Sequence, residues 1–190
     1  MVYRIRKMDW PDIEHIVEID RQCFPTMLPP TSYKTEMINP MAHYFVIFDD
    51  ASAPYILGFA GLWMMAGESH IINLAVRPSH RQLGLGEFLL VCIVEASIGL
   101  KAHLVTLEVR VSNSPAQALY EKYGFIKCGR RKAYYLDNRE DAVIMTLDQP
   151  HSSASLKTLE ILKTEYFLKQ GTVPGLPRDD YASSEANSPP

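Results

Sequence analysis

The stretch best suited to bind a ligand is Arg81–Gly86, which reads RQLGLG and lies between an apolar strand and an apolar helix. Glycine lets the backbone turn sharply and approach a ligand closely. The first N–H groups of a helix lack an intrahelical partner, and the helix dipole favours negative charge beside them. The segment Asn73–Leu90 therefore predicts that backbone groups bind a phosphate or pyrophosphate.

Two familiar phosphate-binding patterns are excluded. Leu89 stands where a dinucleotide fingerprint needs its third glycine, and no Gly-Lys-Ser/Thr follows as in a nucleotide triphosphate loop. The histidines and cysteines show no metal-ligand spacing, so we expect no metal site. An alternative interpretation is that Gly84 and Gly86 only make a tight turn, and the loop alone does not decide between the two.

Glu108 is the candidate base. It lies in a strand predicted over Val105–Val111, where the valines and Leu107 share one face while Glu108 shares the other with Arg110. Among apolar residues, desolvation would raise the pKa of this carboxyl unless a cation offsets it. The strand pattern equally favours a structural pair between Glu108 and Arg110.

Tyr120 is the candidate acid. It shares one helical face with Ala116, Leu119 and Tyr123, which favours simple core filling as the alternative. The ordinary pKa of a tyrosine is about 10, so its hydroxyl keeps its proton at neutral pH and is available as a hydrogen-bond donor.

The elements that must position these residues follow from hydrophobic periodicity and from turn residues. Helices are expected from Asp9 to Phe24, Ser32 to Asn39, Gly84 to Ala96, Ser114 to Gly124 and Ser155 to Gln170. Strands are expected at 2–6, 44–48, 55–65, 70–76, 105–111, 132–136 and 142–147. This order predicts an α/β fold of the α+β type, with a mixed sheet and helices on both faces.

Composition narrows the classes of partner. Of 190 residues, 47% are hydrophobic and 22% charged, as in globular proteins, and the formal charge of −3 argues against nucleic acid. Cys23, Cys92 and Cys128 are too few and too far apart for a disulfide framework. We expect no signal peptide, no membrane span and no membrane partner, and hence a cytoplasmic protein.

The chain resembles the GCN5-related N-acetyltransferases, the GNAT family, whose coenzyme loop has the pattern Arg/Gln-x-x-Gly-x-Gly/Ala. The RimI-type branch, which acetylates the N-terminal alanine of a small-subunit ribosomal protein, is the closer resemblance. The motifs that carry it are Arg81–Gly86, Leu107–Arg110 with Asn113, Ala118–Phe125, Phe24-Pro25, Asn73–Val76, Tyr134-Tyr135, and Glu140–Ala142 followed by Met145.

The resemblance implies a GNAT fold with a mostly antiparallel, twisted central sheet, and acetyl-coenzyme A as cosubstrate. It implies that Glu108 acts as base, directly or through water, and that Tyr120 protonates the coenzyme thiolate. It further implies coenzyme contacts at Leu74, Ala75, Val76, Arg81, Gln82, Leu83, Gly84, Leu85, Gly86, Glu87, Asn113 and Tyr120. The peptide would contact Phe24, Pro25, Asn73, Tyr134 and Tyr135.

Asn113 has an alternative role as a helix cap beside Ser114. The resemblance covers an acetyltransferase domain at 1–148, after which we expect an extra amphipathic helix at 149–170 and a disordered tail at 171–190. The implied activity is acetylation of a protein N-terminus, here the alanine of small-subunit ribosomal protein 18. An α-amine, with a pKa near 8, is neutral roughly 300-fold more often than a lysine at pH 7, so a modest base suffices.

Two alternatives remain open. Acetylation of a small-molecule amine, or of a broader set of protein N-termini, would use the same loop and base. A non-enzymatic alternative is an acyl-coenzyme A-binding module that engages a partner through its terminal helix. An acidic segment, Asp137–Asp141, could attract a basic substrate.

Overall fold

A computed structural model describes residues 3–24, 31–51 and 55–170. The strands are β1 (Tyr3–Lys7), β2 (Ala42–Asp49), β3 (Ile56–Met65), β4 (Glu68–Val76), β5 (Leu104–Arg110), β6 (Ile126–Arg131) and β7 (Ala142–Asp148). The helices are α1 (Ile13–Cys23), α2 (Tyr33–Ile38), α3 (Leu85–Gly99), α4 (Ser114–Lys122) and α5 (Ser153–Gln170), with short 3-10 turns at Trp10–Asp12 and Pro78–His80. Pro25 and the predicted tail at 171–190 lie outside the described residues.

The described strands form one sheet in the order β1-β2-β3-β4-β5-β7-β6. Every neighbouring pair is antiparallel except β4 and β5, which run parallel. That parallel pairing lasts only from Glu68 opposite Leu104 to Ile71 opposite Leu107. Beyond Ile71, β4 stays paired with β3 as far as Val76, so the sheet splits between β4 and β5.

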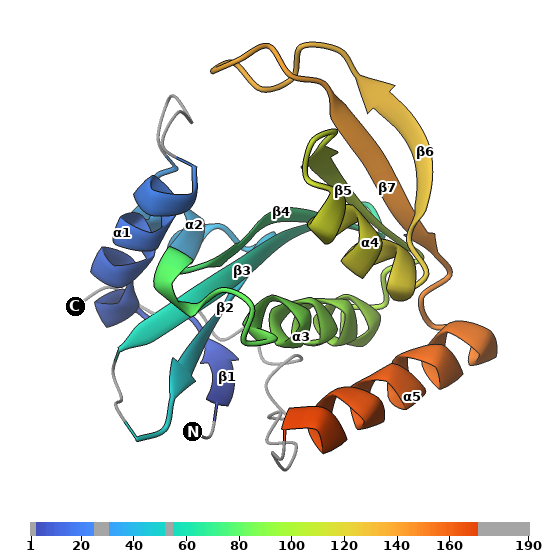
Figure 1. The fold of residues 1–190 in the computed structure, drawn as a ribbon, viewed down its shortest axis with the longest axis horizontal. Coiled ribbons are helices and arrows are strands. Elements are labelled where there is room, and N and C mark those ends of the chain that lie inside the picture. Colours follow the sequence, from blue (N-terminus) through green and yellow to red (C-terminus); the bar gives the residue numbers. More distant parts are fainter. Residues whose placement is uncertain (1–2, 25–30, 52–54, 171–190) are drawn as a thin grey trace.

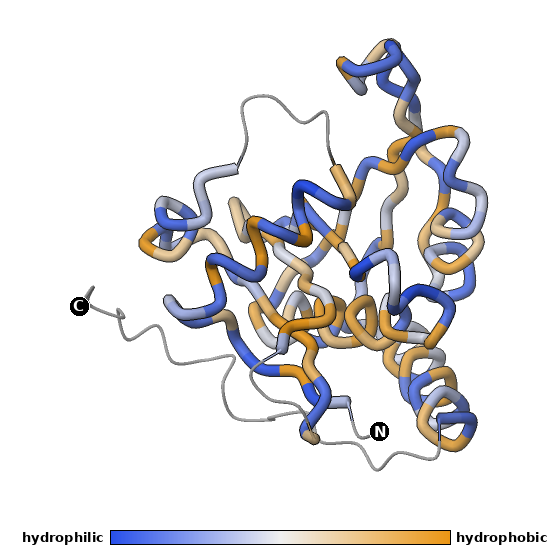
Figure 2. Tube along the Cα trace, turned by 60° about the vertical axis from the view of Figure 1, so that its left-hand side comes forward, coloured by the Kyte–Doolittle hydropathy of each residue, from blue (hydrophilic) through white to orange (hydrophobic). Residues whose placement is uncertain are grey.

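Helices cover both faces of the sheet (Figure 1). On one face, α1 and α2 pack over β2 and β3 through a cluster that includes Ile16, Tyr33 and Phe59. On the other face, α3, α4 and α5 share a larger apolar cluster with the inward residues of the strands. Figure 2 shows hydrophobic residues concentrated in the central strands and α3, whereas the connection between β6 and β7 is mostly hydrophilic.

Buried Arg77 fixes the chain where β4 ends and the glycine loop begins. Its Nε donates to the Ile56 carbonyl at 2.8 Å, and a terminal nitrogen lies 2.7 Å from the Glu18 carboxylate on α1. The guanidinium also lies over the Tyr55 ring, 4.6 Å from its centroid. The entry to the loop is therefore held by both α1 and β3.

The predicted fold class and nearly all predicted elements are confirmed, with one strand wrong. The prediction placed a strand at 132–136, but β6 runs over Ile126–Arg131 and the following residues connect β6 to β7. Every residue of β6 is exposed, so this edge strand lacks the apolar alternation that reveals a half-buried strand. Ala133 and Arg139 have positive φ angles, which fits a connection and not a strand.

No helix in the described ranges is long and apolar enough to cross a membrane. None of the three cysteines, all of which lie in the described ranges, is part of a disulfide, and Cys92 is buried in α3 as its apolar helical surroundings predict.

Candidate active site

The glycine loop turns the chain from β4 into the N-terminus of α3. Gln82 has φ +63°, and Gly84, at +79°, caps the helix in the left-handed conformation. The amides of Glu87 and Phe88 both bond back to the Gly84 carbonyl, at 3.0 and 3.1 Å. The amides that precede Glu87 at the helix start lie too early for intrahelical acceptors, so they are donors for an anion.

The space around this loop fits a diphosphate and the arm attached to it. A Cβ added at Gly86 would meet only Leu74 Cδ2 within 4 Å, at 3.8 Å, so the helix start is open on that side. The split between β4 and β5 begins after Ile71 and leaves the rest of the β4 edge, which leads to the loop, without its β5 partner. An extended arm can pair with that edge as a strand would, and can reach the residues at the base of the split.

Glu108 lies where the split begins, directly after the last residue of β5 that pairs with β4. Its side chain is only 7% exposed. One carboxylate oxygen lies 2.5 Å from His70 Nε2, and the other lies 2.9 Å from Arg131 Nε. The Glu108 carboxylate is thus held by side chains from β4 and β6.

These partners decide the pKa of Glu108. The hydrogen bond from His70 lowers it most, burial raises it, and the charges of His70 and Arg131 lower it further, so the net direction is down from the ordinary value of 4.5. The structure therefore supplies the cation that offsets desolvation. Glu108 does not pair with Arg110, because Arg110 engages the acidic segment.

Tyr120 is buried on α4, with its ring 5.9 Å from the Phe125 ring centroid. Burial raises its pKa to about 12, so the phenol stays protonated. Burial is also the main cause that raises the pKa of Tyr135, and the nearby Arg110 charge lowers it. The phenol is a donor that keeps its proton at neutral pH.

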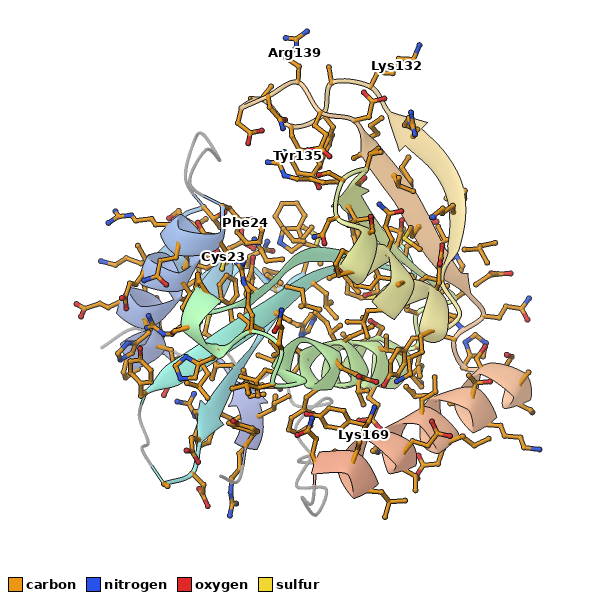
Figure 3. All side chains as sticks on the ribbon, in the orientation of Figure 1. Cys23, Phe24, Lys132, Tyr135, Arg139 and Lys169 are labelled. Carbon is orange, nitrogen blue, oxygen red and sulfur yellow. The ribbon has the colours of Figure 1, made fainter. Side chains whose placement is uncertain are left out.

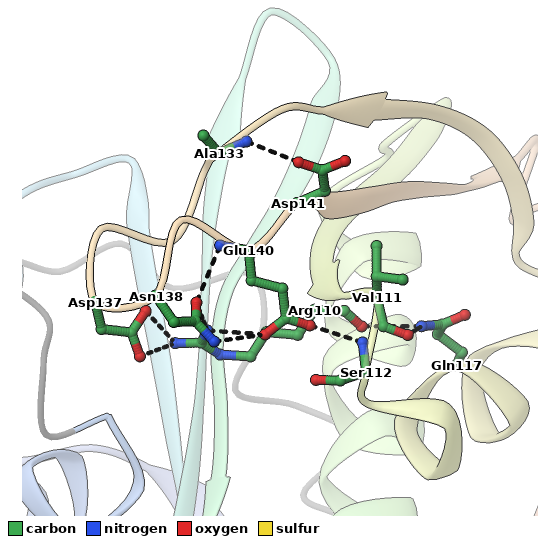
Figure 4. A network of polar contacts seen from close by, with 9 residues as sticks. All are labelled: Arg110, Val111, Ser112, Gln117, Ala133, Asp137, Asn138, Glu140 and Asp141. Carbon is green, nitrogen blue, oxygen red and sulfur yellow. Dashed lines mark hydrogen bonds and ion pairs between the residues drawn. The ribbon is translucent and has the colours of Figure 1, made fainter.

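Arg110 ties the connection between β6 and β7 to β5 (Figure 4). Its guanidinium lies 2.9 Å from Asp137 and 3.2 Å from Glu140, and it stacks 3.8 Å from the Tyr135 ring centroid. Glu140 also accepts the Ser112 amide hydrogen at 2.7 Å, and hydrogen bonds with Ser112 lower the pKa of Glu140 to about 2. Much of the acidic segment is thereby neutralised within the protein, and Tyr135 is held against Arg110.

A second polar cluster lies under α2 on the same face of the sheet. Buried Asn73 accepts a hydrogen bond from the Tyr44 hydroxyl at 3.3 Å, while Asn73 Nδ2 has no partner among the described residues. Glu36 accepts from Trp63 Nε1 at 2.6 Å and from Tyr44 at 3.3 Å. Asn73 thus offers a spare donor next to the free edge of β4.

The structure gives several of the predicted site residues additional partners. Phe24 ends α1 on the side of the molecule where Tyr135 projects from the opposite loop (Figure 3). The Asn113 side chain caps α4 by accepting from the Ala116 amide at 3.3 Å, while its contact with the coenzyme stays a prediction. Glu87 turns its carboxylate toward Lys122 and Tyr123, so only its backbone faces the loop.

Sequence reasoning missed His70 and Arg131. His70 reaches Glu108 from the adjacent strand β4, and Arg131 reaches it from β6, which lies beyond β7 in the sheet. The only sequence signal was alternation along β4, which puts His70 on the polar side of its strand. Among the described residues no group of three or more potential metal ligands is present.

A helix start whose first amides lack intrahelical acceptors, and a split sheet with the His70–Glu108 pair at its base, fit an acyl-coenzyme A-dependent acyltransferase. The model of the acetyltransferase (GNAT) family matches residues 9–125, and the chain belongs to this family. It is therefore an acetyl-coenzyme A-dependent N-acetyltransferase, as the sequence resemblance predicted.

Relatives and solved structures agree with this assignment. A putative [ribosomal protein bS18]-alanine N-acetyltransferase of Bacillus subtilis is 42% identical over 142 residues, covering 74% of this chain and 92% of the relative. An N-alpha-acetyltransferase of Sulfurisphaera tokodaii is 35% identical over 153 residues, covering 75% and 91%. The crystal structure of the Escherichia coli ribosomal-protein-S18-alanine N-acetyltransferase superposes with a TM-score of 0.67 at 29% identity, covering 78% of this chain and 94% of that one.

Proposed function

We propose that this enzyme transfers an acetyl group to the α-amine of a protein N-terminus, and that its substrate is the N-terminal alanine of ribosomal protein bS18 in the cytoplasm. The relatives from B. subtilis and E. coli carry that activity in their names, which supports the substrate. The observation that supports this reaction most directly is the His70–Glu108–Arg131 cluster at the base of the split between β4 and β5.

Bound acetyl-coenzyme A supplies the acetyl group as a thioester. The amides at the start of α3 hold the diphosphate, and the free edge of β4 at Leu74–Val76 holds the arm. Asn113 lies at the start of α4, on the far side of the split, where it can reach the same arm. The glycine loop thereby sets how far the arm extends toward Glu108.

The His70–Glu108 pair takes the proton of the attacking amine, directly or through water. When Nε2 of His70 donates to the Glu108 carboxylate, Nδ1 is the ring nitrogen left to accept a proton. Glu108 then stabilises the charged ring, and Arg131 keeps the carboxylate ionised. An α-amine, which is partly neutral at pH 7, needs no stronger base than this pair.

Tyr120 stabilises the departing thiolate by donating a hydrogen bond. With a pKa of about 12 against about 8.5 for a thiol, full proton transfer would cost roughly 5 kcal/mol. A hydrogen bond needs no such transfer and strengthens as negative charge develops on sulfur. Tyr120 therefore acts as a donor that remains a neutral phenol.

Tyr134 and Tyr135 on one side, and Phe24 and Asn73 on the other, form the walls for the substrate peptide. Acetylation of a polyamine would need free carboxylates to hold several ammonium groups. Asp137 and Glu140 are held by Arg110, and Asp141 lies 3.4 Å from Arg130, which favours a peptide over a polyamine.

Incubation with acetyl-coenzyme A and a peptide carrying the bS18 N-terminus tests the proposal. Mass spectrometry should show one added acetyl group on the α-amine, and none on the same peptide with a blocked N-terminus. Acetylation of spermidine, with the free peptide left unmodified, would contradict the proposed substrate and leave the acetyltransferase reaction in place.

A further inference from the structure

Helix α5 runs antiparallel to α3 and ends beside the glycine loop (Figure 1). The residues of α5 that are buried, Leu159, Lys163, Tyr166 and Phe167, follow the spacing of one helical face. Tyr166 and Phe167 pack on Phe88 of α3, with ring centroids 5.7 and 5.4 Å away. Lys163 Nζ, on a side chain only 10% exposed, lies 2.6 Å from Glu95 of α3.

This docking brings the last turn of α5 into contact with the loop itself. Gln170 Nε2 donates to the Leu83 carbonyl at 3.3 Å. A Cβ added at Gly84 would lie 2.4 Å from Gln170 Nε2 and 3.1 Å from a ring carbon of Tyr166. Gly84 is therefore required by its positive φ angle, and a side chain at this position would also displace the Gln170 amide.

The contact with Leu83 has a consequence for the neighbouring amide. In a planar trans peptide the C=O and the N–H point in opposite directions. Because the Leu83 carbonyl is turned toward α5, the N–H of Gly84 is turned away from α5. A rotation of this one peptide would reverse both groups and would present a carbonyl to an incoming anion.

We propose that α5 is a positioning element for the coenzyme, in which Gln170 holds the Leu83–Gly84 peptide in the orientation that binds the diphosphate. The inference rests on the proposed role of the glycine loop. Gln170 acts through the loop and not on the reacting atoms, so it sets the affinity for acetyl-coenzyme A while the chemical step at His70 and Glu108 stays unchanged.

The test compares Gln170→Ala with the wild-type enzyme on two acetyl donors. With acetyl-coenzyme A the variant should show a KM about 3- to 10-fold higher, the range expected for losing one neutral hydrogen bond, and an unchanged kcat. With S-acetylpantetheine, which has the thioester arm and no diphosphate, the two proteins should have equal KM values. Gln170→Glu, which keeps the length of the side chain but lacks the amide donor, should bind acetyl-coenzyme A at least as weakly as Gln170→Ala.

Leu168→Ala is the matched control, because Leu168 lies in the same helical turn and is 78% exposed. It should match the wild-type enzyme on both donors. The inference about α5 is overturned if Gln170→Ala keeps the wild-type KM for acetyl-coenzyme A, or if Leu168→Ala weakens it equally. A wild-type enzyme that shows the same KM for both donors would instead contradict the role of the glycine loop.

Discussion

His70 and Glu108 lie on neighbouring parallel strands, with Nε2 of the imidazole 2.5 Å from one oxygen of the carboxylate. They meet where β4 and β5 stop pairing, since His70 stands opposite Thr106 and the ladder ends at Leu107. Arg131 holds the other oxygen of Glu108. Both oxygens of the Glu108 carboxylate are thus occupied, and the pKa of this carboxylate is lowered. The proton of the substrate amine is therefore best accepted by the His70–Glu108 pair and not by Glu108 alone.

Replacing His70 by Gln tests this division of roles. Glutamine keeps a donor near Glu108 but accepts no proton at neutral pH, so kcat should fall about 100-fold, the lower range for losing an acid–base group. The KM for acetyl-coenzyme A should stay within about two-fold. Steady-state kinetics with both substrates measures the two effects.

The control for that substitution is His103→Gln. His103 is exposed, and its nearest carboxylate, that of Glu68, is 3.9 Å away. This variant should keep wild-type kinetics. If His70→Gln also kept its activity, Glu108 would have to act as the base without the imidazole.

The pKa of Glu108 gives a prediction for stability against pH. The folded-state pKa lies below the ordinary 4.5, so the ionised carboxylate stabilises the native state fully above pH 4.5. This contribution is lost as the pH falls below 4.5 through the folded-state value. The difference in free energy of unfolding between wild type and Glu108→Gln should therefore shrink with falling pH.

Urea unfolding of both proteins at a series of pH values from neutral to below 4 measures that difference. The reverse trend, in which the advantage of the wild type grows as acid is added, would mean that the pKa of Glu108 is raised in the folded protein. Glu108→Gln should also lose about 100-fold in kcat, in common with His70→Gln.

Local patterns in the sequence predicted the parts of this site that depend on local geometry. Glycine spacing identified the loop before α3, and strand alternation placed Glu108 on the polar face of β5. The partners of Glu108 were missed because they depend on pairing between strands. His70 reaches it through the parallel ladder of β4 and β5, and Arg131 through β6, whose fully exposed residues carry no alternating pattern.

The contact between Gln170 and Leu83 was missed for the same reason. The two residues are 87 positions apart, and nothing near either of them in the sequence marks the contact. The helix over Ser155–Gln170 was predicted from its leucine spacing. Its place against α3 depends on the rings of Tyr166, Phe167 and Phe88, which only the folded chain brings together.

Tyr120→Phe should lower kcat and leave both KM values nearly unchanged. The substitution removes only a hydroxyl from a buried ring, so the packing against Phe125 is kept. Losing one donor to a developing negative charge costs about 100- to 1,000-fold in kcat. Because the pKa of Tyr120 is about 12, ionisation of this tyrosine should not lower the activity of the wild type at any pH below 11.

A pH–rate profile of the wild type and of Tyr120→Phe checks this assignment. The two curves should be parallel from pH 6 to pH 10 and differ by a constant factor. A decline near pH 9 that is present in the wild type and absent from Tyr120→Phe would mean that the phenol ionises during turnover.

Arg110→Gln tests whether the connection between β6 and β7 must be held in place for peptide binding. The substitution removes the ion pairs to Asp137 and Glu140 and the stacking on Tyr135. The KM for the peptide should rise about ten-fold, equivalent to about 1.4 kcal/mol, which lies near the lower range for a lost hydrogen bond to a charged group. The KM for acetyl-coenzyme A should not change, because the glycine loop follows β4 and therefore lies on the opposite side of the split from Arg110 at the end of β5.

Arg139→Gln is the matched control in the same connection, since Arg139 projects away from the site in Figure 3. It should leave both KM values at their wild-type level. If Arg110→Gln instead raised the KM for acetyl-coenzyme A and left the peptide unaffected, Tyr134 and Tyr135 could not form the peptide wall, because their loop is fixed to the sheet by Arg110. A change in the KM for the peptide without a change in the KM for acetyl-coenzyme A would therefore place the two substrates on opposite sides of Glu108.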